Sequence, residues 1–158
     1  MCTQEITMTN SIKKNKSWRT INLDPKKQSH REKILQAREL FWGSKDEAYI
    51  DWLYYQNPFG PLYCSLAIDG DVIAGQYVVV PIDFFINGSR VRGSLSLDTF
   101  THPDYRCAGI FTKLAENVYS LLNADGIAFT VGLPNDNSRP GFLKYLKFEE
   151  RYSVYRMI

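Results

Sequence analysis

The loop from Arg106 to Gly109 has the residue types and the position needed to hold a phosphate group. Residues 94–101 before it alternate with the two-residue period of a strand, and from Ile110 onward apolar residues recur every three or four positions, as on one helix face. The loop therefore leads into a helix N-terminus, where main-chain N–H groups lack helical partners and the helix dipole is positive. With an arginine beside them, such groups favour phosphate binding. The alternative is an ordinary connection with a solvated arginine.

The segment from Pro103 to Phe111 resembles the acetyl-CoA loop of the GNAT superfamily of N-acetyltransferases, commonly Arg/Gln-x-x-Gly-x-Gly/Ala after a strand. Arg106 and Gly109 match this pattern, whereas Phe111 stands where a small residue is usual and could narrow the pyrophosphate seat. The resemblance implies that the pyrophosphate is bound along Arg106, Cys107, Ala108, Gly109, Ile110 and Phe111. Within the superfamily, residues 106–114 and 132–142 look closest to the Eis-like branch.

The resemblance also implies a role for two other segments. Main-chain groups of Thr99, Phe100 and Thr101 are expected to bind the pantetheine arm where their strand diverges from the strand at 127–133. A main-chain N–H within residues 97–100 is expected to polarise the thioester carbonyl. Asn135, Asn137 and Ser138 look like the family's second segment, where an asparagine and the following helix flank the pantetheine and the thioester. Arg139 is expected near a phosphate of CoA, with a solvated side chain as the alternative.

Acetyl transfer from a thioester to an amine needs a base for the amine and an acid for the departing thiolate. Asp98 is the only carboxylate on the strand, and the resemblance implies that it removes the proton through a water molecule; it could instead be a hydrogen-bond anchor for a neighbouring loop. The family usually places a tyrosine acid early in the following helix. Phe142 lies near that place without a hydroxyl, so Tyr145, about one turn further on, is the predicted acid; a tyrosine packed in the core is the alternative.

The elements that position these residues follow from periodicity and from breaks at Gly, Pro and Asn. Strands are predicted at residues 18–23, 62–68, 72–86, 90–101, 127–133 and 148–157, and helices at 29–42, 44–56, 110–125 and just before Leu146. This order is that of a GNAT-like α/β (α+β) fold, a mixed central sheet of about six strands with flanking helices. The final strand of the usual fold is missing, so the chain is expected to be either a short form or a piece of a longer protein. Residues 1–16 are expected to form a flexible tail, and residues 17–158 a single acetyl-CoA-binding domain.

Three local features predict how the sheet is connected. Asn87-Gly88 is typical of a type I′ hairpin turn, because both residues tolerate a positive φ. Pro81 inside a long strand indicates an edge position or a bulge. The strands at 90–101 and 127–133 should be parallel, because a single helix joins them.

Composition narrows the function classes. The chain has 158 residues, 44% of them hydrophobic, which is typical of a folded globular domain, and a net charge of +2, which does not favour nucleic acid or an anionic membrane as a partner. The sequence has no long apolar run and no apolar signal segment at its start, so we expect a cytoplasmic protein without a membrane span. Cys2, Cys64 and Cys107 are then expected to be free thiols, and no metal site is predicted.

These observations predict an N-acetyltransferase that moves an acetyl group from acetyl-CoA to an amine of an unidentified small-molecule or sugar acceptor. The alternative is a catalytically inactive GNAT-like module that binds CoA or a partner. Pairing of two copies through the exposed edge of the final strand would give a homodimer.

Overall fold

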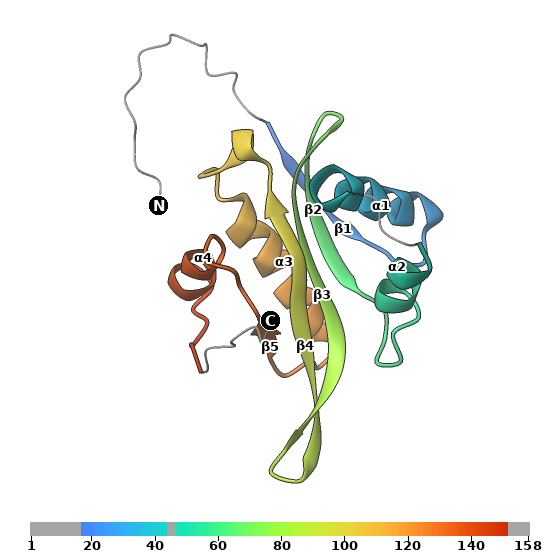
Figure 1. Ribbon diagram of the computed structural model, residues 1–158, viewed down its shortest axis with the longest axis vertical. Helices are drawn as coiled ribbons and strands as arrows, with labels where there is room; N and C mark the ends of the chain where they lie inside the picture. Colours follow the sequence, from blue (N-terminus) through green and yellow to red (C-terminus); the bar gives the residue numbers. More distant parts are fainter. Residues whose placement is uncertain (1–16, 44–46, 152–158) are drawn as a thin grey trace, which may run out of the picture.

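The computed structural model describes residues 17–43 and 47–151, and its centre is a five-stranded mixed sheet (Figure 1). The strands lie in chain order across the sheet: β1 (Arg19–Leu23), β2 (Tyr63–Asp69), β3 (Val72–Ile86), β4 (Ser89–Thr101) and β5 (Thr130–Gly132). The first four pair antiparallel, and β5 pairs parallel with β4, as the single connecting helix predicted. The predicted mixed α/β fold is confirmed.

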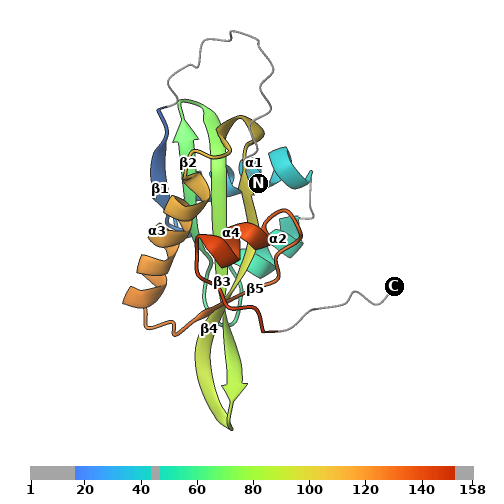
Figure 2. The ribbon, with the colours of Figure 1, turned by 90° about the vertical axis from the view of Figure 1, so that its left-hand side faces the viewer.

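Helices cover both faces of the sheet. Figure 1 shows α1 (Gln28–Trp42) and α2 (Glu47–Tyr54) on one face, and Figure 2 shows α3 (Ile110–Ala124) and α4 (Arg139–Lys144) in front of the other. Each face has its own buried core, because successive strand residues point to opposite sides of a sheet. In β3, Val78 packs with α1 and α2, whereas its neighbours Tyr77 and Val79 pack with α3.

Two strand predictions need correction. The strand predicted at 127–133 is shorter, Thr130–Gly132, because Ile127 and Ala128 bond to Leu122 and Arg92 outside a regular ladder. The sixth predicted strand, 148–157, is not a strand over residues 148–151, and its remainder lies outside the described residues. The predicted tail at 1–16 also lies outside them.

The turn at Asn87-Gly88 and the edge position of Pro81 are both confirmed. Asn87 and Gly88 have φ values of 50° and 79°, both positive as a type I′ turn requires. The pairing of β2 with β3 ends at Val79, so the main chain at Pro81 lies past the end of β2. There the Pro81 carbonyl accepts a hydrogen bond of 3.1 Å from the Asn57 amide. A proline is therefore tolerated where no neighbouring strand needs its missing N–H.

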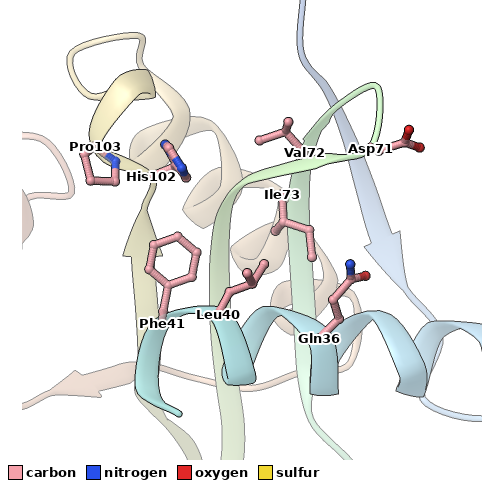
Figure 3. Close-up of a pocket in the computed structure, with 8 residues that line it drawn as sticks. All are labelled: Gln36, Leu40, Phe41, Asp71, Val72, Ile73, His102 and Pro103. Atoms are coloured by element: carbon pink, nitrogen blue, oxygen red, sulfur yellow. The ribbon is translucent and has the colours of Figure 1, made fainter.

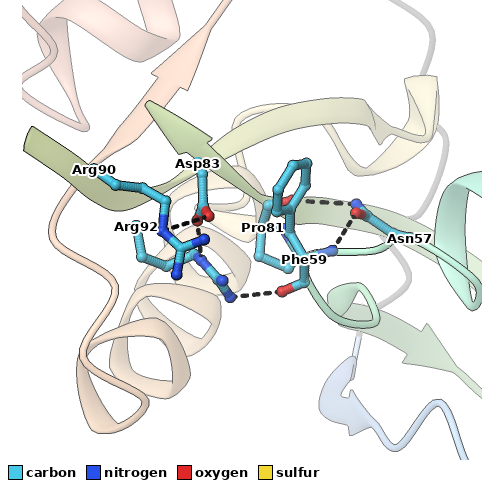
Figure 4. A network of polar contacts seen from close by, with 6 residues as sticks. All are labelled: Asn57, Phe59, Pro81, Asp83, Arg90 and Arg92. Carbon is cyan, nitrogen blue, oxygen red and sulfur yellow. Dashed lines mark hydrogen bonds and ion pairs between the residues drawn. The ribbon is translucent and has the colours of Figure 1, made fainter. Parts of the chain in front are cut away.

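A polar network fixes the hairpin of β3 and β4 where it projects beyond the sheet (Figure 4). Asp83 accepts from Arg92 and forms an ion pair of 3.3 Å with Arg90 on the opposite strand. Arg92 also donates to the main-chain oxygen of Phe59, at 2.7 Å. These contacts join the hairpin to the loop after α2.

Candidate functional site

β4 and β5 pair only briefly and then separate. Their ladder consists of three pairs, from Ser94 opposite Thr130 to Ser96 opposite Gly132. β4 continues to Thr101, but β5 ends at Gly132, so residues 97–101 have no strand partner on the β5 side among the described residues. We call this part of β4 the open edge. The sequence predicted that the two strands diverge here.

The register shows which main-chain groups face the open edge. Phe100 lies opposite Gln76, and the His102 N–H donates to the Ala74 oxygen at 2.9 Å, so Phe100 and His102 direct their main-chain groups toward β3. Main-chain direction alternates along a strand. The N–H and C=O groups of Thr99 and Thr101 therefore face the open edge, whereas those of Phe100 are used in the β3 ladder.

A β-bulge precedes these residues. Val78 lies opposite Leu97 and Gln76 opposite Phe100, so Asp98 and Thr99 together lie opposite the single residue between them, Tyr77. Asp98 has a φ of 47°, in the left-handed region that residues other than glycine rarely adopt. The bulge changes the alternation of β4, and no feature of the sequence pattern predicted it.

The bulge also moves the Asp98 side chain to the α1 and α2 face. Its carboxylate forms an ion pair with Arg38 of α1 and accepts a hydrogen bond from the Tyr54 hydroxyl of α2. Arg38 donates to the same hydroxyl, and the Gln76 amide donates to the Asp98 main-chain oxygen at 2.9 Å. Burial raises the pKa of Tyr54 above its usual value of 10, so this hydroxyl keeps its proton. The contacts favour an anchoring role for Asp98, with two helices as its partners.

The predicted phosphate loop lies at the end of β4, between a 3-10 turn (Pro103–Tyr105) and α3. Tyr105 is buried and donates to the Asp69 carboxylate at 2.9 Å, which fixes the turn against β2. The four residues from Arg106 to Gly109 are exposed, and Gly109, at a φ of 74°, begins α3. The first N–H groups of α3 follow directly and have no helical partner.

The cysteine prediction is wrong at one position and confirmed at another, and the third position, Cys2, lies outside the described residues. Cys107 of this loop is disulfide-bonded. Cys64 is free and buried, and burial raises the pKa of its thiol above the usual value of 9.

Phe111 does not stand in the exposed loop. Its ring packs against Phe142 of α4 and Tyr77 of β3, with ring centroids 5.4 Å and 5.8 Å away. α4 lies close enough that a Cβ on Gly141 would come within 3.1 Å of the Phe111 ring. Phe111, which the resemblance placed where a small residue is usual, thus belongs to the aromatic core beneath α4.

The remaining predicted residues lie on or near α4. Asn135 accepts from the Ser138 N–H at 3.0 Å and so begins the helical turn, while Asn137 is exposed. Arg139 pairs with Glu150, which raises the pKa of the arginine. Tyr145 is 56% exposed, and the Lys144 ammonium lies 5.4 Å from its ring centroid. The tyrosine is therefore not in the core, and its hydroxyl is accessible.

A separate pocket of about 370 Å³ lies on the α1 side of the sheet (Figure 3). It is lined by Gln36, Leu40 and Phe41 of α1, by Asp71, Val72 and Ile73 at the β2–β3 turn, and by His102 and Pro103. None of the predicted site residues lines it.

Sequence reasoning missed Arg38 and Tyr54 as partners of Asp98. One signal was present: Arg38 follows Ile34 and Leu35 and precedes Phe41 at helical spacing, so a charged residue stands on an apolar helix face. Such an arginine is buried only with a partner, and here its side chain is 2% exposed. The partner is on a strand far along the chain, so the sequence pattern could not name it.

Two further predictions were that the protein has no membrane span and no metal site. In residues 17–43 and 47–151, no helix combines the length and the apolarity that crossing a bilayer requires. Within the same residues, no three or more His, Cys, Asp or Glu side chains gather where they could hold a metal ion.

Solved structures share this fold at low sequence identity. A GCN5-related N-acetyltransferase from Ralstonia eutropha is 15% identical, with a TM-score of 0.69 over 90% of this chain and 99% of that one. An aminoglycoside 6'-N-acetyltransferase from Acinetobacter baumannii is 17% identical, with a TM-score of 0.65 over 90% and 97%. A predicted acetyltransferase from Clostridium acetobutylicum, crystallised with acetyl-CoA, is 17% identical, with a TM-score of 0.65 over 90% and 96%.

Comparison with curated proteins gives no significant match. The model of a family described as an acetyltransferase (GNAT) domain matches residues 22–150. This match includes the open edge, the loop before α3 and α4, and it confirms the resemblance that residues 103–111 indicated. The chain therefore belongs to the GNAT acetyltransferase domain family.

Proposed function

We propose that this protein transfers an acetyl group from acetyl-CoA to an amine of a small-molecule or sugar acceptor. The observation that supports this best is the open edge of β4, which leads into the exposed loop at the N-terminus of α3. Unpaired main-chain groups and a positive helix end thus lie in succession along one segment. This succession suits a donor that has amide groups in its arm and a pyrophosphate beyond them.

Donor binding divides between the two parts of this segment. The N–H groups of Ile110 and Phe111, with Arg106 nearby, would bind pyrophosphate oxygens. The main-chain groups of Thr99 and Thr101 would pair with the pantetheine amides, as an added strand does. Asn137 and Arg139 would complete the site from α4; Arg139 would then have to exchange Glu150 for a phosphate.

The reaction requires the amine nitrogen to attack the thioester carbonyl, the C–S bond to break, and one proton to pass from nitrogen to sulfur. An N–H group of the open edge, such as that of Thr99, would stabilise the carbonyl oxygen as it gains negative charge; one such donor is worth about 10² to 10³ in rate. For proton transfer we propose Tyr145 as the acid. Asp98 would act as a base only if water reached its carboxylate beside Arg38 and Tyr54.

The acceptor is proposed only as a class, a primary amine on a small molecule or sugar. The Acinetobacter protein acts on aminoglycosides, but 17% identity supports a common fold and not a common substrate. Placement in the Eis-like branch likewise stays a proposal based on residues 106–114 and 132–142.

Thermal unfolding with and without acetyl-CoA tests donor binding. A ligand at 100 times its dissociation constant stabilises the folded state by about 2.7 kcal/mol. Arg106→Glu should weaken binding at least 10-fold, whereas Arg19→Glu, a charge reversal on β1 away from the loop, should leave it unchanged. No stabilisation of the wild type by acetyl-CoA would contradict the proposal.

Release of free CoA thiol in the presence of a panel of amines tests transfer. Thiol release that requires an amine supports the enzyme. Donor binding without thiol release would instead support the alternative function, a catalytically inactive module that holds CoA.

A further inference from the structure

The side chains of Arg38 and Tyr54 contact Asp98, the one residue of the open edge with a left-handed φ. They come from α1 and α2, and both side chains end at the Asp98 carboxylate. Arg38 also donates to the Tyr54 hydroxyl, so the three side chains form a closed cluster. The Arg38 side chain is 2% exposed and that of Asp98 is 15% exposed, so most of this cluster is shielded from water.

The cluster fixes the backbone as well as the side chain. Asp98 adopts its φ of 47° at some conformational cost, and a bulge with such a residue persists only when its surroundings hold it. Arg38 and Tyr54 hold the Asp98 carboxylate on the helix side, and Gln76 holds its main-chain oxygen from β3. Without the bulge, the even-numbered residues Asp98 and Phe100 would face the open edge in place of Thr99 and Thr101.

The hydrogen bonds of the cluster are incomplete. Nε and Nη2 of Arg38 and Oε1 of Gln76 are buried and have no hydrogen-bond partner among the described residues. Buried polar groups without partners lower stability, so these atoms offset part of what the ion pair and hydrogen bonds of the cluster contribute.

We propose that Arg38 and Tyr54 are positioning residues for acetyl transfer: by holding Asp98 in the left-handed bulge, they aim the Thr99 N–H at the thioester carbonyl. The inference rests on the proposed function, because it assigns the open edge to the acyl donor. Neither residue contacts the reacting atoms. Their effect is therefore expected on the chemical step and not on the phosphate loop.

Matched variants of neighbouring residues test this. Tyr54→Phe removes the hydroxyl that reaches Asp98, and Tyr55→Phe removes a buried hydroxyl without a partner among the described residues. Arg38→Lys changes the buried cation, and Arg31→Lys changes a more exposed one on the same helix. Tyr54→Phe and Arg38→Lys should lower kcat at least 10-fold with less than a threefold change in acetyl-CoA affinity. Both controls should stay within twofold of the wild type in kcat.

Hydrogen exchange of main-chain amides gives a measurement that does not depend on activity. Val78 and Phe100 lie on either side of the bulge, and their amides should exchange faster in Tyr54→Phe than in Tyr55→Phe. Equal exchange in the two variants, or equal kcat in the two folded variants, would overturn the proposal. If the wild type shows no acetyl transfer, the proposed function is wrong, and so is the proposal that Arg38 and Tyr54 position groups for that reaction. Faster exchange in Tyr54→Phe would then still assign the two residues to the bulge itself.

Discussion

Arg38 of α1 and Asp98 of β4 form an ion pair that joins a helix to the bulge in a strand. The Arg38 side chain is almost fully buried, and Tyr54 hydrogen-bonds to both partners. A lone buried charge is strongly unfavourable, so each of these two side chains requires the other beside it as a counter-charge. The pair therefore connects the stability of the domain to the shape of the open edge.

Asp98→Ala should lower the free energy of unfolding by about 3 kcal/mol, because it leaves the Arg38 guanidinium buried without its counter-charge. Asp51→Ala is the matched control. It breaks the Arg31–Asp51 pair between α1 and α2, but those side chains are 32% and 42% exposed, so the loss should stay below about 1 kcal/mol. Urea unfolding measures both. Similar losses in the two variants would show that the Arg38–Asp98 pair contributes no more to stability than the exposed Arg31–Asp51 pair.

Gly109→Ala and Gly126→Ala should destabilise the protein equally but affect the donor differently. Both glycines flank α3 at nearly the same φ, 74° and 71°, and a Cβ at either would meet nothing within 4 Å. The cost is therefore backbone strain, about 1 to 2 kcal/mol in each case. Only Gly109→Ala should reduce acetyl-CoA affinity, by roughly 10-fold or more, when binding is measured by calorimetry. Equal affinity in both variants would remove the loop from the donor site.

Tyr145→Phe should lower kcat without changing stability. The side chain is 56% exposed, so loss of its hydroxyl should change the unfolding free energy by less than about 0.5 kcal/mol. Loss of a general acid typically costs about 10² to 10⁴ in rate. Tyr49→Phe, at an exposed tyrosine of α2 on the other side of the sheet, is the control. If both variants keep wild-type kcat with a small amine, Tyr145 is not the acid.

Sedimentation should detect a dimer if residues 152–157, the part of the predicted final strand that lies outside the described residues, pair with a second copy. An unpaired strand edge favours such pairing. Val154→Pro would remove one main-chain donor within that predicted strand and should shift the protein toward monomer. A monomer at high concentration in the wild type would count against self-association.

Local sequence signals predicted most of the fold. The helices, the β3–β4 hairpin and the parallel crossing from β4 to β5 depend on periodicity, on Asn87-Gly88 and on one intervening helix, all of which act over short stretches of chain. The loop from Arg106 to Gly109 was also located by its position between a strand and a helix. The family match over residues 22–150 agrees with the predicted fold.

The sequence by itself thus determined the order of the elements and the position of the loop from Arg106 to Gly109 between a strand and a helix, because hydrophobic period, turn residues and helix ends are local properties. Only the tertiary structure decided the conformation of Asp98, since the partners that hold it, Arg38 and Tyr54, lie on helices distant in the sequence. It also decided which β4 residues face the open edge, because one extra residue in a strand exchanges the directions of all that follow.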